Sequence, residues 1–472
     1  MTTLDQPTRS GATQRPVAGT RRPLAAVLAA VGIPMFMVTL DNLVVTTALP
    51  VIREELGASL GHLQWFVNAY TLPFAALLLT AAALGDRMGR RRLFLVGIAL
   101  FTLASAACAL ATEPWMLITA RALQGVGGAA VMPLSLTLLA TAVPDRLRDP
   151  AIGIWGGISG LGVAVGPVVG GAVVKGLDWS WIFWLNVPVG LVAIVLARLV
   201  LTESRAAATR LDPLGLLLSA TGVLALVWGV IRGQEHGWTA GPTLAALIAG
   251  GVLLVLFVGW ERRTPTPMLP MGLFRSRGFR NVNGVTLAFS VGVFGSVFLL
   301  AQFFQVAQGQ SPLGAGLRTM PWTMAPMVVA PIAGLIVNRV GARTLIVTGQ
   351  ALLAAALGWI AIVASPDVAY ASLVPPFLLA GVGMGLTFAP TSTLALASVS
   401  PEAQGVASGT LNTIRELGVA IGVAALASIF VANGGYGSSE AFTDGLVAAV
   451  GVGAAVVALG ALLALRLPGR GR

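Results

Sequence analysis

Residues 84–92 read Leu-Gly-Asp-Arg-Met-Gly-Arg-Arg-Arg, a short charged segment between two long apolar runs. The flanking runs cover residues 64–84 and 93–111, and each has about the 20 residues that a helix needs to cross a bilayer's hydrocarbon core. Comparable runs recur from residue 24 to residue 466, separated by short polar breaks. The chain is therefore expected to be an integral membrane protein.

About fourteen membrane-spanning helices are expected. Hydrophobic residues form 56% of the 472-residue chain and charged residues only 10%, from which a soluble surface cannot be built. The runs are continuously apolar and do not alternate, which favours helices over a β-barrel. The expected spans are residues 24–49, 64–84, 93–111, 115–140, 151–174, 182–201, 214–231, 241–260, 282–306, 317–336, 344–364, 371–396, 406–430 and 443–466.

The net charge of +11 indicates membrane orientation, not nucleic-acid binding. With the N-terminus inside, 22 of the 29 Lys and Arg residues fall on the cytoplasmic side and four outside, while Arg121, Arg198 and Arg415 lie within spans. Because basic residues are retained on the cytoplasmic side, both termini are expected there, in a protein of the cell membrane. Anionic lipid headgroups also attract these residues.

The charged segment has an echo in residues 334–343, Gly-Leu-Ile-Val-Asn-Arg-Val-Gly-Ala-Arg. The charged segment follows span two, and its echo follows span ten. If the chain has two similar halves of six spans each, the second half therefore begins at span nine. Spans seven and eight are then an insertion between the halves. Secondary transporters are often built from such repeats, with the binding site where the halves meet. The expected parts are a disordered cytoplasmic tail (1–22), an N-terminal bundle (23–203), the inserted pair (204–263), a cytoplasmic linker (264–280), a C-terminal bundle (281–467) and a second tail (468–472).

Ionisable side chains inside the spans are the first candidates for function, because a charge at a helix centre costs roughly 2.5 to 3.5 kcal/mol. Asp41 and Glu416 are the acids, and Arg121 and Arg415 are the bases. Burial raises the pKa of a carboxyl group and a nearby arginine lowers it, so such a pair can bind and release a proton. Asp41 is expected to carry the proton with Arg121 as its partner or regulator; the alternatives are a structural ion pair or an acid at a helix end. Glu416 can titrate, contact a cationic substrate or neutralise Arg415.

A glycine-rich stretch lies in the fifth span. Glycine allows helices to approach closely, and proline removes a backbone donor, so either a close helix crossing or a bending, gating helix is expected. The residues concerned are Gly162, Gly166, Pro167, Gly170 and Gly171.

Polar and aromatic side chains elsewhere in the spans are candidates for a substrate cavity, although each can also serve helix packing. They are Asn42, Asn68, Tyr70, Gln302, Gln305, Trp322, Met327, Phe388 and Asn412. Because acids are scarce in the spans, neutral or singly charged amphiphilic compounds are favoured over doubly charged cations.

Enzymatic chemistry is not indicated. The sequence contains no His-Glu-x-x-His motif and no Gly-x-x-x-x-Gly-Lys-Ser/Thr loop, so a membrane metalloenzyme or an ATP-driven permease lacks its usual residues. Cys108 is the only cysteine, which excludes an internal disulfide and a thiol metal cluster. No enzymatic activity, metal or cofactor is expected.

From residue 24 to 466 the sequence resembles the major facilitator superfamily, specifically its fourteen-span drug:proton antiporters. Residues 84–92 resemble the family's first signature, and residues 121–128, Arg-Ala-Leu-Gln-Gly-Val-Gly-Gly, resemble that of span four. Residues 162–171 resemble the glycine-proline signature associated with antiport, and residues 40–50 and 179–190 resemble signatures of the fourteen-span branch. Departures from the family pattern are Ala82, Leu43, Thr46, Ser180 and Asn338.

This resemblance implies alternating access driven by the proton gradient, with export of hydrophobic or amphiphilic compounds such as drugs, antibiotics or a metabolite. Import or symport of a small organic solute is the alternative, against which the glycine-proline signature speaks. The resemblance further implies that Asp86 contacts the N-terminal end of a second-half helix and that arginines bridge the halves. The implied gating residues are Gly85, Asp86, Arg87, Gly89 and Arg90, with Asn338 and Arg339 in the second half; Asn338 replaces an acid, so the gate is expected to depend mainly on the first copy. A monomer is expected to be functional.

Overall fold

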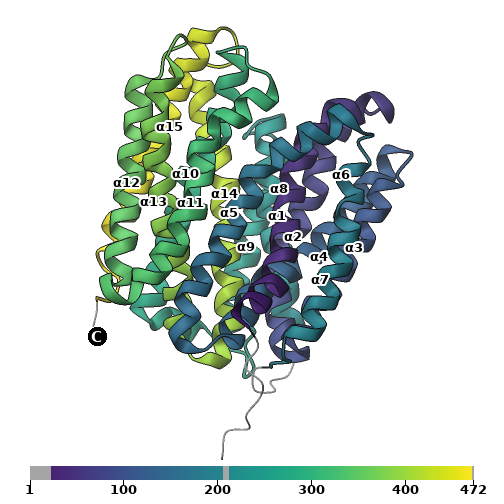
Figure 1. Cartoon of the computed structure of the whole chain (residues 1–472), viewed down its shortest axis with the longest axis vertical. Helices are drawn as coiled ribbons and strands as arrows, with labels where there is room; N and C mark the ends of the chain where they lie inside the picture. Colours follow the sequence, from purple (N-terminus) through teal and green to yellow (C-terminus); the bar gives the residue numbers. More distant parts are fainter. Residues whose placement is uncertain (1–22, 206–211, 470–472) are drawn as a thin grey trace, which may run out of the picture.

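The computed structural model describes residues 23–205 and 212–469, and within these ranges all regular secondary structure is helical (Figure 1). The expected tails at residues 1–22 and 470–472 lie outside the described residues. The helices are α1 Leu24–Glu55, α2 Leu60–Met88, α3 Arg90–Ala109, α4 Pro114–Ala142, α5 Asp145–Gly176, α6 Trp181–Trp184, α7 Asn186–Val200, α8 Pro213–His236, α9 Gly241–Glu261, α10 Arg277–Val306, α11 Pro312–Val340, α12 Ala342–Val363, α13 Tyr370–Ala397, α14 Gln404–Asn433 and α15 Ser439–Ala464, with short 3-10 turns η1 Met271–Arg275 and η2 Pro401–Ala403.

Thirteen helical segments of the described chain are long and apolar enough to cross a membrane, α6 and α7 counting as one segment. The remaining expected span is α5, a helix of 32 residues that packs against both α1 and α11. The prediction of an all-helical membrane protein is therefore confirmed. The count of fourteen spans and the cytoplasmic position of the termini stay predictions.

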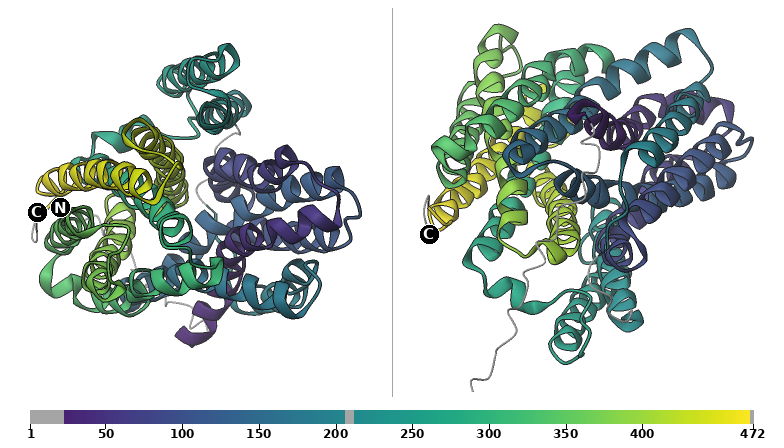
Figure 2. Two further views of the ribbon diagram at one scale, coloured as in Figure 1. Left: turned by 90° about the horizontal axis from the view of Figure 1, so that it is seen from above. Right: turned by 60° about the horizontal axis from the view of Figure 1, so that its bottom comes forward.

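The helices form two bundles and a separate pair. Helices α1 to α7 make one bundle and α10 to α15 the other, while α8 and α9 stand outside both (Figure 2). The pair is attached through α8, which packs on α2 and α14. At this contact Val223 of α8 belongs to one apolar cluster with Leu72 of α2 and Leu417 of α14. The inserted pair thus contacts both bundles.

The charged segment at residues 84–92 is almost entirely helical, so the break between the two helices is shorter than the expected spans 64–84 and 93–111 suggest. Helix α2 continues to Met88 and α3 begins at Arg90, leaving only Gly89 between them. Gly89 has φ of 119°, a conformation that glycine adopts without steric cost. The echo uses the same device, since Gly341, with φ of 93°, alone separates α11 from α12.

The expected span at residues 182–201 is broken near its start. Helix α6 ends at Trp184 and α7 begins at Asn186. Pro188 explains the break, because its ring conflicts with the carbonyl four residues earlier, that of Trp184, and it has no N–H to donate. As a result Asn186 stands at a helix start and is buried inside the first bundle.

The two bundles are in close contact on the side where α1 begins and the chain ends, here called the termini side. A Cβ on Gly153 of α5 would lie 2.5 Å from the carbonyl oxygen of Ala330 in α11, and one on Gly334 of α11 would meet the backbone of Asp149 in α5. Only glycine permits such an approach. Towards the opposite side the ribbons of the two bundles diverge (Figure 1).

Gly153→Val is expected to force the bundles apart on the termini side, because overpacking a close contact costs about 1–3 kcal/mol. A cysteine introduced at Ala330 of α11, which is buried and lies against Gly153, reports the change through its rate of modification by a soluble maleimide, and native Cys108 is itself buried. The rate should rise several-fold in Gly153→Val. The matched control is Gly358→Val in α12, where a Cβ meets nothing within 4 Å. Equal rates in both variants would refute the steric account.

Candidate functional site

Asp41 of α1 is the centre of a buried polar cluster in the first bundle. Its Oδ2 accepts a hydrogen bond from Arg121 Nη1 at 2.5 Å. Its Oδ1 accepts one from Gln124 Nε2 at 2.9 Å and one from Asn186 Nδ2 at 2.8 Å. With three donors around one carboxyl group, this arrangement suits the charged carboxylate.

Arg121 of α4 is fully buried and is held by protein groups alone. Its Nε donates to the carbonyl of Phe66 at 3.0 Å, and its Nη1 also donates to Gln124 Oε1 at 2.7 Å. The guanidinium lies 4.3 Å from the centre of the Tyr70 ring, within the range of a cation–π interaction. Among the described residues, Asp41 is the one acid that forms a salt bridge with Arg121. When a proton neutralises Asp41, Arg121 therefore loses this partner.

Two residues of the cluster, Gln124 and Asn186, had no role assigned from the sequence. Gln124 follows Arg121 by three positions, so both side chains project from the same face of α4. Asn186 reaches Asp41 because the helix break places it at the start of α7. Ser105 of α3 accepts hydrogen bonds from both amides, at 3.3 and 2.9 Å, and completes the cluster. The helical spacing could have identified Gln124, but the contact of Asn186 depends on the tertiary fold.

Tyr70 belongs to this cluster. In addition to its contact with Arg121, its hydroxyl donates to the carbonyl of Val38 at 3.3 Å. Tyr70 is also close enough to Glu416 of α14 to interact with it electrostatically. Tyr70, a residue expected in the substrate wall, thus lies near Asp41 of the first bundle and near Glu416 of the second.

Arg415 and Glu416 are not an ion pair in the described residues, whose salt bridges involve other side chains. Arg415 is buried, and its Nη1 donates to Asn412 Oδ1 at 2.8 Å. Its guanidinium lies 4.1 Å from the centre of the Phe388 ring. Glu416 is partly exposed. The structure therefore joins Phe388, Asn412 and Arg415 in one group.

The residues expected to form a gate connect the two bundles on the termini side. Asp86 Oδ1 accepts from Arg90 Nε at 2.6 Å, and Asp86 Oδ2 accepts from the backbone N–H of Val406 at 3.1 Å. Val406 is in the first turn of α14, where backbone donors lack partners within the helix and attract negative charge. Arg90 Nη2 also donates to the carbonyl of Glu402 at 3.4 Å. These are the cross-bundle contacts that the resemblance implies.

The other residues of the first segment and its echo lie at the same level. Gly85 packs on Leu134, and Arg87 is near the acids Asp212 and Glu261 of the inserted pair. In the echo, Asn338 of α11 lies near Asp149 of α5, and Arg339 is the next residue of the same helix end. The second copy therefore also makes a contact between the bundles, which the expectation of a gate based mainly on the first copy did not include.

The glycine-proline stretch lies in α5, which is helical from Asp145 to Gly176. A Cβ on Gly162 would lie 2.9 Å from Cβ of Thr39 in α1, so this glycine allows a close crossing of the two helices two residues from Asp41. Gly166, Pro167, Gly170 and Gly171 follow towards the C-terminal end of the helix. The close crossing is present at Gly162, and a gating movement stays a prediction.

The other substrate-wall candidates lie in several parts of the structure, and their role in a substrate cavity stays a prediction. Gln302 is half-buried and Gln305 is exposed near the C-terminal end of α10, and each donates to a carbonyl of its own helix. Trp322 is buried against Phe377 within the second bundle, and Met327 of α11 is 40% exposed. The structure places Asn68 on α2 and Asn42 on α1, and the side chain of Asn42 lies outside the described part.

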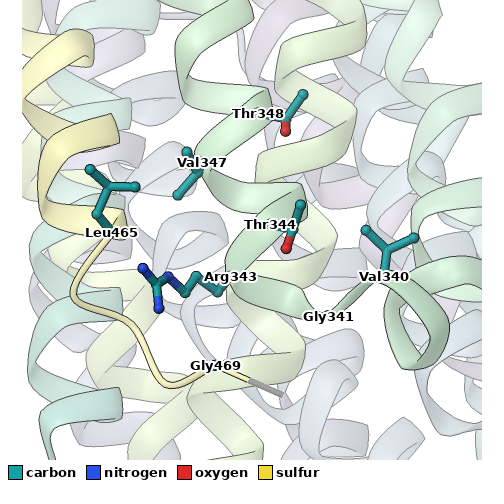
Figure 3. A pocket seen from close by; sticks show the side chains of 8 residues that line it. All are labelled: Val340, Gly341, Arg343, Thr344, Val347, Thr348, Leu465 and Gly469. Carbon is teal, nitrogen blue, oxygen red and sulfur yellow. The ribbon is translucent and has the colours of Figure 1, made fainter.

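A surface pocket is found on the termini side, at the start of α12 (Figure 3). Its lining consists of Val340, Gly341, Arg343, Thr344, Val347, Thr348, Leu465 and Gly469, all of the second bundle and the chain end. It contains neither the Asp41 cluster nor the Arg415 group, and it lies away from the contact between the bundles. We therefore do not assign it to the transport path.

Two helical bundles, a buried ion pair inside the first and polar contacts between the two define a secondary-transporter architecture. Residues 31–423 match the Major Facilitator Superfamily, and the chain belongs to this family.

Relatives and solved structures agree with this assignment. The chain is 38% identical over 407 residues to the multidrug resistance protein Stp of Mycobacterium tuberculosis, covering 86% of this chain and 75% of that protein. It is 35% identical over 427 residues to the tetracenomycin C resistance and export protein of Streptomyces glaucescens, covering 90% and 79%. The human organic anion transporter MFSD10 superposes with a TM-score of 0.70 over 94% of this chain and 100% of that one, at 14% identity, which shows the fold alone.

Asn186→Ala is expected to destabilise the first bundle, because it removes one of the three donors to the Asp41 carboxylate. A hydrogen bond to a charged group contributes about 1.5–3 kcal/mol to stability, and a neutral one about 0.5–1.5 kcal/mol. Thermal unfolding of the purified protein measures the loss. Asn283→Ala is the matched control, since Asn283 of α10 is equally buried but donates to the uncharged carbonyl of Phe279. A loss in Asn186→Ala no larger than that in the control would mean that the bond to Asp41 contributes nothing special.

Proposed function

We propose that the protein is a proton-coupled antiporter that exports small hydrophobic or amphiphilic compounds by alternating access. The observation that carries this proposal is the buried Asp41–Arg121 pair, with Oδ2 and Nη1 2.5 Å apart, in a chain whose two bundles meet through Asp86 and Val406. A proton-binding group inside one bundle and a separable contact between the bundles are the two parts that such a cycle requires.

In this cycle a proton from outside binds Asp41 and neutralises it. Arg121 then loses its acidic partner and favours a rearrangement of α1 and α4. When the contacts of Asp86 and Arg90 with α14 break, the termini side opens, the proton leaves to the cytoplasm and substrate enters. Each charge moved inward through a membrane potential of 100 mV supplies roughly 2.3 kcal/mol, to which a pH gradient adds.

Export is favoured over import by the relatives and by the sequence of α5. One relative is named as an export protein and another as a multidrug resistance protein. The glycine-proline stretch of α5 resembles the signature associated with antiport. We accordingly place the protein in the plasma membrane with both termini in the cytoplasm, acting as a monomer on small molecules, driven by the proton gradient without enzymatic activity or a cofactor.

Transport into inverted membrane vesicles with an imposed pH gradient tests the proposal on a panel of lipophilic compounds. Substrate addition should release protons from the vesicle interior, and Asp41→Asn should abolish this release because the proton carrier is lost. The matched control is Asp367→Asn, which removes an exposed acid between α12 and α13 and should leave coupling intact. Coupled transport in Asp41→Asn would refute the role of Asp41, and accumulation that an uncoupler leaves unchanged would refute proton coupling.

A further inference from the structure

Arg415 is a buried cation without an acidic partner in the described chain. Only 3% of the residue is exposed, and none of the salt bridges among residues 23–205 and 212–469 includes it. Glu416 interacts with it electrostatically but does not pair with it. Neighbouring residues of a helix point in different directions, so the two side chains do not meet head to head.

The hydrogen bonds of Arg415 leave one edge of its guanidinium open. Nη1 donates to Asn412, whose own amide is fixed by a bond to the carbonyl of Ser408 at 2.9 Å. Nε is buried and has no hydrogen-bond partner in the described residues. Nε and Nη2 form the edge with which arginine binds a carboxylate or a similar oxyanion at two points.

An unpaired buried charge is costly, and Arg121 shows how the same chain satisfies one. Arg121 is also fully buried but bonds to Asp41, Gln124 and a backbone carbonyl. Arg415 has an amide and an aromatic ring in place of a carboxylate. A buried guanidinium without an anionic partner is destabilising. We therefore expect a bound ligand to supply the missing interactions of Arg415 during the transport cycle.

The flat surface beneath Arg415 indicates the rest of that missing group. Its guanidinium lies over one face of Phe388, and Phe388 stacks on Trp155 of α5 with ring centres 6.2 Å apart and 29° between the planes. Phe388 belongs to the second bundle and Trp155 to the first, where its Nε1 donates to Ser135 at 3.0 Å. The stack therefore separates when the bundles separate at this level, and Phe388 then loses an aromatic neighbour.

Resting on the proposed export function, we propose that Phe388 and Arg415 form the loading site for a planar aromatic compound that carries an anionic oxygen group. The ring of this compound stacks on Phe388, and its oxygen atoms bind the Nε edge of Arg415. In the state closed on the termini side, Trp155 occupies the position of the substrate ring and promotes its release.

Equilibrium binding to the purified full-length protein in nanodiscs tests this proposal. Three probes share one ring system and differ in charge: anthraquinone-2-sulfonate, the neutral 2-methylanthraquinone and an anthraquinone carrying a trimethylammonium group. The sulfonate should bind most tightly and the cation least. Equal affinities, or a preference for the cation, would overturn the proposal.

Arg415→Gln should weaken binding of the sulfonate by roughly ten-fold to one-hundred-fold, as expected for a lost charge-assisted hydrogen bond, and binding of the neutral probe by less than two-fold. Arg415→Lys should keep the preference for the anion at reduced affinity, because it keeps the charge and loses the planar edge. Thermal unfolding without ligand confirms that both variants fold. A folded Arg415→Gln that retains the wild-type preference would refute the role of Arg415.

The closed state gives a second test that leaves the loading site intact. Asp86→Asn weakens the contact with Val406 on the termini side and should tighten sulfonate binding, because more molecules then have Phe388 free of Trp155. Weaker or unchanged binding would contradict the place of Trp155 in the cycle. These measurements use no gradient, so binding without proton-driven transport would refute the proposed function alone, and coupled transport without the anion preference would refute the loading site alone.

Discussion

A charge inside a membrane protein must find its partners within the protein, because the hydrocarbon core supplies none. Asp41 and Arg121 meet this constraint in the first bundle, and the placement of several helices follows from it. Helices α1 and α4 supply the pair, α3 supplies Ser105, and the break before α7 brings in Asn186. Three donors from α4 and α7 point at the Asp41 carboxyl group, so a proton bound there alters the hydrogen bonding of several helices together.

The contact between the bundles meets a different requirement, since it must hold and yet come apart. Its parts are small: glycines that let backbones touch at Gly153 and Gly334, and the hydrogen bond of Asp86 to the first turn of α14. A helix start offers unpaired N–H groups that water can satisfy equally well after separation. Water can therefore replace these polar contacts when the bundles separate.

Much of this arrangement could be predicted from the sequence. Long apolar runs indicated the helices, the echo of residues 84–92 indicated two halves, and Asp41 and Arg121 stood out as charges where charges are rare. The sequence could not show that α2 continues to Met88, since a charged helix end in water and a charged loop have the same composition. Nor could it bring Asn186 to Asp41 or Trp155 to Phe388, because these contacts join residues far apart in the chain.

Arg121 and Arg415 carry the same charge and are similarly buried. They differ in the kind of partner that each has, and this difference matters for the exchange of a proton against a substrate. The partner of Arg121 is an acid of the protein, which a proton can neutralise; the partners of Arg415 are an amide and a ring, which leave an edge open. Tyr70 lies against Arg121, in the first bundle, and Phe388 lies against Arg415, in the second. Each half of the carrier thus holds one buried cation. A proton at Asp41 and a substrate at Arg415 are coupled if binding of either one changes the stability of the contact between the bundles, because the other site opens or closes with that contact.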